Sequence, residues 1–163
     1  MINFKKKDYL LIIFILCIIT LSAAYVLQYI LGYQPCNLCI IERIPYWLAI
    51  VILILNYKFK KNYIFYNVLL LQIFTFSIII SLYHLGIEQG LVVESEVCLS
   101  ENLDLLNKEN ILDSLKILRV SCKDVTIRIF GLSLTTYNML VSLLLLLISI
   151  KIYLNKNNDR KQN

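Results

Sequence analysis

The sequence is poor in charged residues. Only 17% of its 163 residues are Asp, Glu, Lys or Arg, whereas ordinary soluble domains carry about 25%. It also lacks internal repeats and has a single histidine. In contrast, 59% of the residues are hydrophobic and the mean hydropathy is +0.72. The composition therefore excludes an ordinary soluble domain and a repeat architecture, and it indicates a membrane protein.

Four apolar stretches meet or approach the length of about 20 residues that a bilayer-spanning helix needs. None has a charge in its apolar centre. The spans cover residues 9–31, 40–57, 63–85 and 130–153. The sequence therefore predicts an all-α membrane protein, a four-transmembrane-helix bundle with two extracytoplasmic loops. Its single membrane domain would cover residues 1–155, with a long second loop at 86–129 and a cytoplasmic tail at 156–163.

Charges are distributed unevenly around these spans. Basic residues predominate before the first span, at residues 58–61 and after the fourth span, whereas residues 86–129 carry eight acids and five bases, a net charge of −3. Because excess Lys and Arg marks cytoplasmic flanks, both termini are predicted to be cytoplasmic and both loops extracytoplasmic. The net charge of +5 thus reflects topology, and no nucleic-acid partner is expected.

The N-terminal segment also has features of a secretory signal, with a basic start and small residues at 22–24. Its apolar run continues to residue 31, however, whereas the hydrophobic region of a signal usually spans about 7–15 residues. Cleavage after Ala24 would also leave three spans. The sequence therefore favours an uncleaved first helix.

Two local patterns refine the helices. Pro45 lacks a backbone donor and is tolerated near a helix start, so the second helix is expected to begin close to Cys39. In the second loop, "NLDLLNKENILDSLKILRV" has leucines at near-helical spacing. This pattern predicts an amphipathic helix that either lies on the outer membrane surface or packs on its own loop.

The sequence has five cysteines. Cys17 falls in the middle of the first span, where a lone cysteine usually acts as a small apolar filler. Cys36, Cys39, Cys98 and Cys122 all fall on the predicted outer side, where an oxidising compartment favours disulfides. A Cys98–Cys122 bridge would stabilise the loop by about 3 kcal/mol. A Cys36–Cys39 bridge closes so short a ring that it constrains almost nothing, which favours a chemical role.

The surroundings of Cys39 support this interpretation. A position at a helix N-terminus favours a thiolate. Arg43 is four residues further on, so on a helix it would share a face with Cys39 and add a positive charge. Both effects favour the reactive form of Cys39, and Arg43 would lie where the polar head of a lipid-soluble molecule sits.

Zinc binding is the main structural alternative for four cysteines. Structural zinc sites bring two closely spaced pairs together, and here only Cys36 and Cys39 have that spacing. His84, at the end of the third span, could complete such a site only by coincidence. The sequence therefore predicts no metal site.

These residues resemble the bacterial DsbB family of inner-membrane disulfide bond formation proteins, the protein-disulfide:quinone oxidoreductases. The resemblance rests on "QPCNLCIIER", on Cys98 and Cys122, and on "FGLSLTTYNMLVS" at the start of the last span. It covers the four-helix core and implies a multi-pass protein of the bacterial inner (cytoplasmic) membrane with periplasmic active cysteines.

The resemblance implies a role for each pair. Cys36 and Cys39 would be the quinone-proximal pair, with Cys39 facing ubiquinone or menaquinone and Arg43 beside it. Cys98 and Cys122 would oxidise a periplasmic thioredoxin-like partner of the DsbA type, Cys98 forming the mixed disulfide. Electrons would pass from the partner to Cys98–Cys122, then to Cys36–Cys39, then to the quinone.

Three further questions stay open at the level of the sequence. His84 approximately matches a histidine that lies near the quinone in some family members, but an interfacial structural histidine is equally consistent with its position. A disulfide-stapled membrane scaffold would have the same cysteines without turnover. A vitamin K epoxide reductase-like enzyme would run similar chemistry, typically with its Cys-x-x-Cys pair late in the chain.

Overall fold

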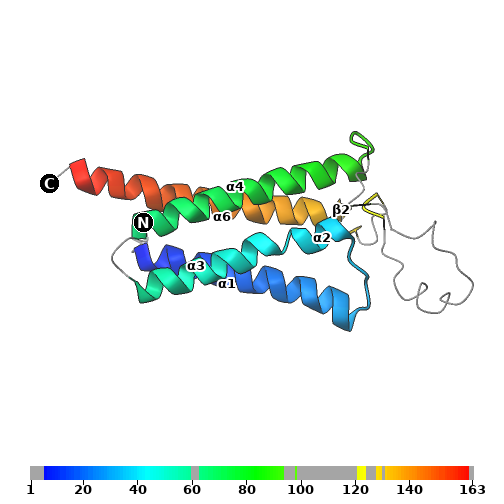
Figure 1. The fold of residues 1–163 in the computed structure, drawn as a ribbon, viewed down its shortest axis with the longest axis horizontal. Coiled ribbons are helices and arrows are strands. Elements are labelled where there is room, and N and C mark those ends of the chain that lie inside the picture. Colours follow the sequence, from blue (N-terminus) through cyan, green and yellow to red (C-terminus); the bar gives the residue numbers. More distant parts are fainter. Residues whose placement is uncertain are drawn as a thin grey trace, which may run out of the picture.

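Four long helices lie side by side in the computed structural model, which describes residues 6–59, 63–93, 98, 121–123, 128–129 and 131–161 (Figure 1). The bundle helices are α1 (Lys6–Tyr25), α3 (Ile44–Lys58), α4 (Tyr63–Glu88) and α6 (Leu134–Lys161). The shorter elements are η1 (Val26–Ile30), α2 (Asn37–Ile41), β1 (Arg128–Ile129) and β2 (Leu132–Ser133). The prediction of a four-helix membrane bundle is confirmed.

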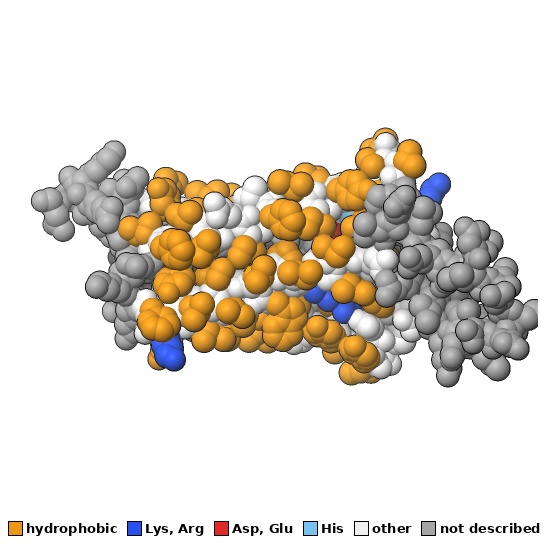
Figure 2. Space-filling view, viewed as in Figure 1, with side chains coloured by type: hydrophobic (Ala, Val, Ile, Leu, Met, Phe, Trp, Pro, Cys, Tyr) orange, Lys and Arg blue, Asp and Glu red, His pale blue; other side chains and the backbone are white. Residues whose placement is uncertain are grey.

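Four helical stretches among the described residues are long and apolar enough to cross a membrane, of which the first joins α1 to η1 and the second joins α2 to α3. These stretches are Asp8–Ile30, Asn37–Lys58, Ile64–Glu88 and Leu134–Leu154. In the most apolar 18 residues of each stretch, only 17–33% is buried inside the protein. Most apolar side chains therefore face outwards, and Figure 2 shows them covering the visible side of the bundle. A helix satisfies its own backbone hydrogen bonds, which is why such sequences form helices in lipid.

The first helix ends in an irregular turn. Hydrogen bonding over residues 26–30 changes to the π pattern, with the Leu31 amide bonded to the Val26 carbonyl at 3.1 Å. Gly32 then adopts a φ of 75°, a left-handed conformation that glycine enters without steric cost. The chain thereby leaves the helix and reaches Cys36 in an extended conformation.

The second span is interrupted near its start. The sequence predicts one helix from about residue 40, but the structure has the five-residue helix α2, a turn at residues 42–43, and then α3. Pro45 lies in the first turn of α3, where its missing N–H removes no helical hydrogen bond. The turn keeps right-handed helical backbone angles at Glu42 and Arg43, and Cys39 and Arg43 line the same cavity.

The fourth helix begins four residues later than the sequence predicts. A hairpin of β1 and β2 pairs Arg128 with Ser133 and Ile129 with Leu132, and Gly131 in its turn has a φ of 83°. Ser133 then caps α6, because its Oγ accepts the amide of Thr136 at 3.3 Å. The amphipathic helix predicted at residues 102–120 lies outside the described residues.

Small polar residues let α4 and α6 pack closely along the bundle. Ser77 and Ser142 are fully buried and their Oγ atoms lie 2.9 Å apart. The Tyr46 hydroxyl joins this contact from α3, with its oxygen 2.9 Å from the Ser142 Oγ, and it also donates to the Asn138 side chain. Inside a membrane, helices associate through such close packing and interhelical hydrogen bonds. This contact holds together the helices that carry the candidate site.

Candidate functional site

Cys36 and Cys39 lie at the start of α2. Cys36 is the N-cap residue, with an extended backbone (φ −69°, ψ 169°), and its Sγ accepts the Cys39 amide at 3.3 Å. The Cys36 thiol also donates to the Cys39 sulfur, with 2.8 Å between the two Sγ atoms. A disulfide needs about 2.05 Å, so a small rotation of the side chains would close one.

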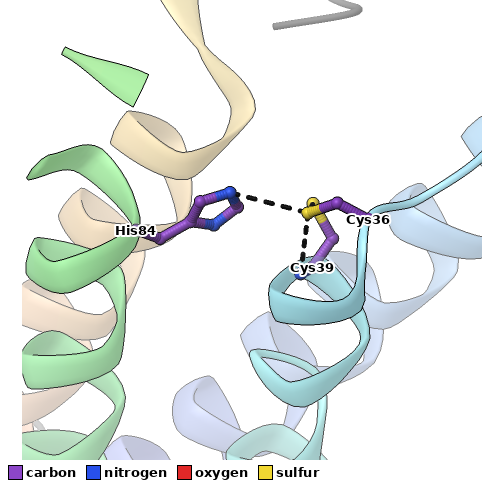
Figure 3. A group of neighbouring side chains, drawn as sticks. All are labelled: Cys36, Cys39 and His84. Atoms are coloured by element: carbon purple, nitrogen blue, oxygen red, sulfur yellow. Dashed lines mark hydrogen bonds between the residues drawn. The ribbon is translucent and has the colours of Figure 1, made fainter. Parts of the chain in front are cut away.

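His84 faces this pair from the last turns of α4 (Figure 3). The residue is 1% exposed, and Nε2 lies 3.5 Å from the Cys36 Sγ. The sequence left the role of this histidine open. The structure brings it into direct contact with the cysteine pair, although the two are 48 positions apart in the chain.

Two carboxylates and a hydroxyl surround His84. Oε1 of Glu42 lies 3.1 Å from Nδ1, and Oε1 of Glu88 lies 3.9 Å from Nε2. Thr135 Oγ1 lies 3.3 Å from Nδ1 and donates to Glu88. Sequence reasoning missed all three as site residues. The spacing of His84 and Glu88 by four along α4 was a usable signal for that pair, whereas nothing local connected Glu42 or Thr135 to the histidine.

Arg43 contacts residues of α1 and η1. Its Nη1 donates to Oε1 of Gln28 at 2.5 Å, and its guanidinium carbon lies 5.1 Å from the centre of the Tyr25 ring. A cation over an aromatic face at this distance is a favourable contact. Glu42 and Arg43 thus face different neighbours, as expected for adjacent residues.

Cys98 and Cys122 pack against the Cys36 region. Both are buried, and they share one apolar cluster with Cys36, Leu38 and Ile87. Cys39 is half-buried and packs against the same cluster, so all four predicted redox cysteines meet at one end of the bundle. Cys17 lies elsewhere, fully buried in the core between the helices, as a structural cysteine would.

Two thiols in this cluster are held in the neutral form. The hydrogen bond with Cys39, together with burial, raises the pKa of Cys36 above that of an ordinary thiol. Burial, followed by a hydrogen bond with Cys98, raises the pKa of Cys122, and the charge of Cys36 adds to this effect.

A cavity of about 620 Å³ adjoins the cysteines, within the range of 300–1,000 Å³ typical of small-molecule sites. Its polar lining includes Cys36, Cys39, Arg43, His84 and Cys122. Its apolar lining comes mostly from α1, η1 and α6, with Leu21, Ala23, Ala24, Leu27, Leu134 and Val141 among the residues. The arrangement can hold an apolar molecule with a polar head next to a pair of thiols.

The same place also collects donor atoms of the kind that bind metals. Among the described residues, one ligand atom each from Cys36, Cys39 and His84 lies within 4.8 Å of the other two. The sequence argument against zinc considered four cysteines in two close pairs. The structure offers a different set, two sulfurs and one imidazole.

Fold and site together define the class of protein: a multi-pass helical membrane protein with a Cys-x-x-Cys pair in contact with a histidine. The chain belongs to the DsbB family, since the model of the family "Disulfide bond formation protein DsbB" matches residues 6–152. It is also similar to the uncharacterized protein RP370 of Rickettsia prowazekii (strain Madrid E), with 34% identity over 155 residues, covering 90% of this chain and 89% of the relative. No solved structure gives a significant match. The resemblance expected from the sequence is confirmed, and the family is that of membrane oxidoreductases of disulfide bond formation.

Proposed function

We propose that this protein is a quinone-dependent thiol oxidase that reoxidises a periplasmic DsbA-type dithiol oxidant. The observation that carries the proposal is the contact of the Cys36–Cys39 pair with His84 at the wall of a cavity that Cys122 also lines. Thiols, a proton acceptor and a largely apolar binding space then meet in one place. A disulfide-stapled scaffold needs neither a proton acceptor beside its thiols nor an apolar binding space.

The relay begins at Cys98 and Cys122. A reduced partner attacks the Cys98–Cys122 disulfide, with Cys98 forming the mixed disulfide, and the pair is left as two thiols. Exchange then passes the electrons to the Cys36–Cys39 disulfide. Thiol–disulfide exchange requires sulfurs that approach each other, and the shared cluster of Cys36 with Cys98 and Cys122 supports this route.

Reduced Cys36 and Cys39 must then lose two protons and two electrons to become a disulfide again. His84 is the group beside the Cys36 sulfur that can accept a proton. A carboxylate can only accept hydrogen bonds, so Glu42 holds the proton of His84 on Nδ1 and leaves Nε2 directed at Cys36. The raised pKa of Cys36 means that its thiol tends to keep its proton. His84 is placed to accept that proton.

The cavity is the proposed binding space for the electron acceptor, ubiquinone or menaquinone, which supplies the oxidising power. Its apolar walls suit an isoprenoid chain and its polar end, with Arg43 and His84, suits quinone oxygens. Gln28 and Tyr25 hold the guanidinium of Arg43 in place. Cys39 lines the same cavity and is the sulfur proposed to face the quinone.

The proposed orientation places the site in the periplasm of a bacterium, with the protein in the inner membrane. The beginning of α1 and the end of α6 lie at one end of the bundle, and α2 lies at the other (Figure 1). The basic flanks of the sequence belong to the first end, which favours cytoplasmic termini. The cysteine cluster then faces the oxidising compartment in which disulfides form.

The direct test is turnover with purified components. Protein in detergent is mixed with a reduced DsbA-type protein and a soluble quinone, and quinone reduction is followed by absorbance while thiols are counted by alkylation. We expect one quinone reduced per partner disulfide formed. The Cys36→Ser variant should stop quinone reduction, and Cys98→Ser should stop partner oxidation. If the wild-type protein leaves both quinone and partner unchanged, the scaffold explanation holds instead.

A further inference from the structure

Three donor atoms that suit a soft divalent metal meet beside the cavity. We propose that, when Cys36 and Cys39 are reduced, these two residues and His84 bind a Zn²⁺ ion reversibly. The contacts of the sulfurs and the ring nitrogen, all mutually within 4.8 Å, carry the proposal. The site would exist in one redox state alone, because both sulfurs of a disulfide are unavailable as thiolate ligands.

The distances fit tetrahedral coordination. With Zn–S near 2.3 Å and Zn–N near 2.05 Å, a tetrahedral angle places sulfur about 3.6 Å from nitrogen and the two sulfurs about 3.8 Å apart. The Cys36 Sγ already lies 3.5 Å from Nε2 of His84. The two Sγ atoms, now 2.8 Å apart, need to separate by only about 1 Å, which a side-chain rotation of Cys39 supplies.

The surroundings of His84 match those of a metal-binding histidine. Ligating histidines almost always donate their other N–H to a carboxylate, a carbonyl or water, which fixes the tautomer and the ring orientation. Glu42 supplies this carboxylate, 3.1 Å from Nδ1. The lone pair of Nε2 is thereby directed towards Cys36, where the metal would lie.

Donor chemistry and access also favour zinc. Two thiolates and an imidazole are ligands that select zinc over magnesium or calcium. The two negative charges of the thiolates neutralise the two positive charges of the ion. This set leaves a fourth position open, as in catalytic zinc sites. The ion can enter through the cavity, which all three ligands line.

Binding involves no electron transfer. Two S–Zn bonds and one N–Zn bond form, and the two thiol protons pass to solvent. The loaded thiols cannot form a disulfide until the ion leaves, so zinc would stop the oxidase in its reduced state. This consequence for turnover rests on the proposed function, whereas the binding itself does not.

The test measures binding in the absence of quinone and partner. Full-length protein with Cys98→Ser and Cys122→Ser, which leaves the proposed site intact, is prepared with Cys36 and Cys39 either reduced or oxidised. Zn²⁺ is titrated in competition with a chromophoric chelator of known affinity. We expect one equivalent bound to the reduced form and an affinity at least about 100-fold lower for the oxidised form. Co²⁺ in place of Zn²⁺ should give thiolate-to-metal charge-transfer absorption and the visible bands of a tetrahedral site.

Variants assign the ligands. Cys39→Ser preserves the size of a half-buried side chain. It should abolish both the binding of one equivalent of Zn²⁺ and the charge-transfer absorption with Co²⁺. Glu42→Gln should weaken zinc about 10–100-fold without removing the band, as expected for a residue that positions a ligand, and Cys17→Ser should change neither. Equal binding by the oxidised and reduced forms, or a full equivalent retained by Cys39→Ser, would overturn the proposal. Failure of turnover with zinc absent would instead count against the proposed function.

Discussion

Nδ1 of His84 lies 3.1 Å from Oε1 of Glu42, which determines the ring nitrogen that faces Cys36. Both side chains are buried, so water screens this contact weakly and the carboxylate cannot easily turn away. The contact also joins the turn between α2 and α3 to the end of α4. We therefore propose Glu42 as a positioning residue that acts on the cysteine pair through His84.

Replacing Glu42 with Gln retains its size and removes its charge. The imidazole then loses its charged hydrogen-bond acceptor, and we expect the turnover number to fall roughly tenfold, about 1.4 kcal/mol in the barrier. The Michaelis constant for quinone should change by less than about twofold, because no ground-state contact to the quinone is removed. Steady-state quinone reduction measures both constants.

Glu88→Gln is the matched control for this prediction. Its carboxylate lies near the same histidine but 3.9 Å from Nε2, and Thr135 already donates to it. We expect its turnover to fall less than about threefold. An equal loss in the two variants, or a higher Michaelis constant with unchanged turnover in Glu42→Gln, would contradict the positioning role.

Cys122 gives a prediction about pH. Burial and the hydrogen bond with Cys98 raise its pKa, so the neutral thiol is favoured in the folded protein. Alkylation requires the thiolate and should therefore stay slow at pH 8, then accelerate only well above the ordinary thiol value of about 8.5. Mass spectrometry of reduced protein alkylated at a series of pH values measures the rate, with unfolded protein as the reference.

The same shift predicts how stability depends on pH. The folded-state pKa of Cys122 lies above its unfolded value. The contribution of the neutral thiol to the free energy of unfolding is therefore fully present below the unfolded pKa. It is lost as the pH rises through the folded value, and the free energy of unfolding of the reduced protein should decline above about pH 8.5. The decline should be smaller in Cys122→Ser. A thiol that alkylates at pH 7 as fast as in the unfolded chain would refute the shift.

The proposed orientation can be tested by labelling. Single cysteines are placed at Lys58, at the end of α3, and at Leu91, beyond the end of α4, in protein with its own cysteines replaced. A thiol reagent that cannot cross membranes should label residue 91, and not residue 58, in intact cells with a permeable outer membrane. Equal labelling at both positions would show that the assigned sidedness is wrong.

Much of this architecture can be predicted from the sequence because hydropathy and charge act locally. The four apolar runs and their basic flanks predict the bundle, and the Cys-x-x-Cys motif with its neighbours indicates the family, and both are confirmed. The turn at residues 42–43 was not predicted, because Pro45 allows a helix to start at more than one place. The contacts of His84 with Cys36 and Glu42 depend on the rotation of α4 about its axis, which buried serines such as Ser77 set by interhelical packing.

That packing gives a prediction about stability. In Tyr46→Phe, the hydroxyl that links α3 to Asn138 and Ser142 is removed, leaving buried polar groups with fewer partners. The expected loss is about 1–3 kcal/mol of stability, measured as a lower thermal midpoint in detergent. Thr75→Val is the control, because the hydroxyl of Thr75 is exposed and bonds to its own helix. A midpoint of Tyr46→Phe no lower than that of the control would show that the network does not hold α3 to α6.

Arg43 gives the sharpest test of the division of labour in the site. Its guanidinium lines the cavity and is held by Gln28 and Tyr25. Arg43→Lys retains the charge but loses the planar fork, and the two side chains are not interchangeable at such a site. We expect Lys to raise the apparent Michaelis constant for quinone about tenfold, equivalent to about 1.4 kcal/mol, and Arg43→Ala to lower turnover as well.

Partner exchange should survive both changes, because Cys98 and Cys122 lie in a different loop from Arg43. Rapid mixing of the oxidised protein with reduced partner, without quinone, measures this exchange apart from quinone reduction. Gln28→Leu is a milder change, because it removes a hydrogen-bond acceptor of Arg43 and leaves the guanidinium in place. It should raise the Michaelis constant for quinone less than Arg43→Lys does. If Arg43→Ala halted partner exchange while Cys36 and Cys39 still reduced quinone normally, Arg43 would belong to the partner site and the proposed direction of the relay would have to be redrawn.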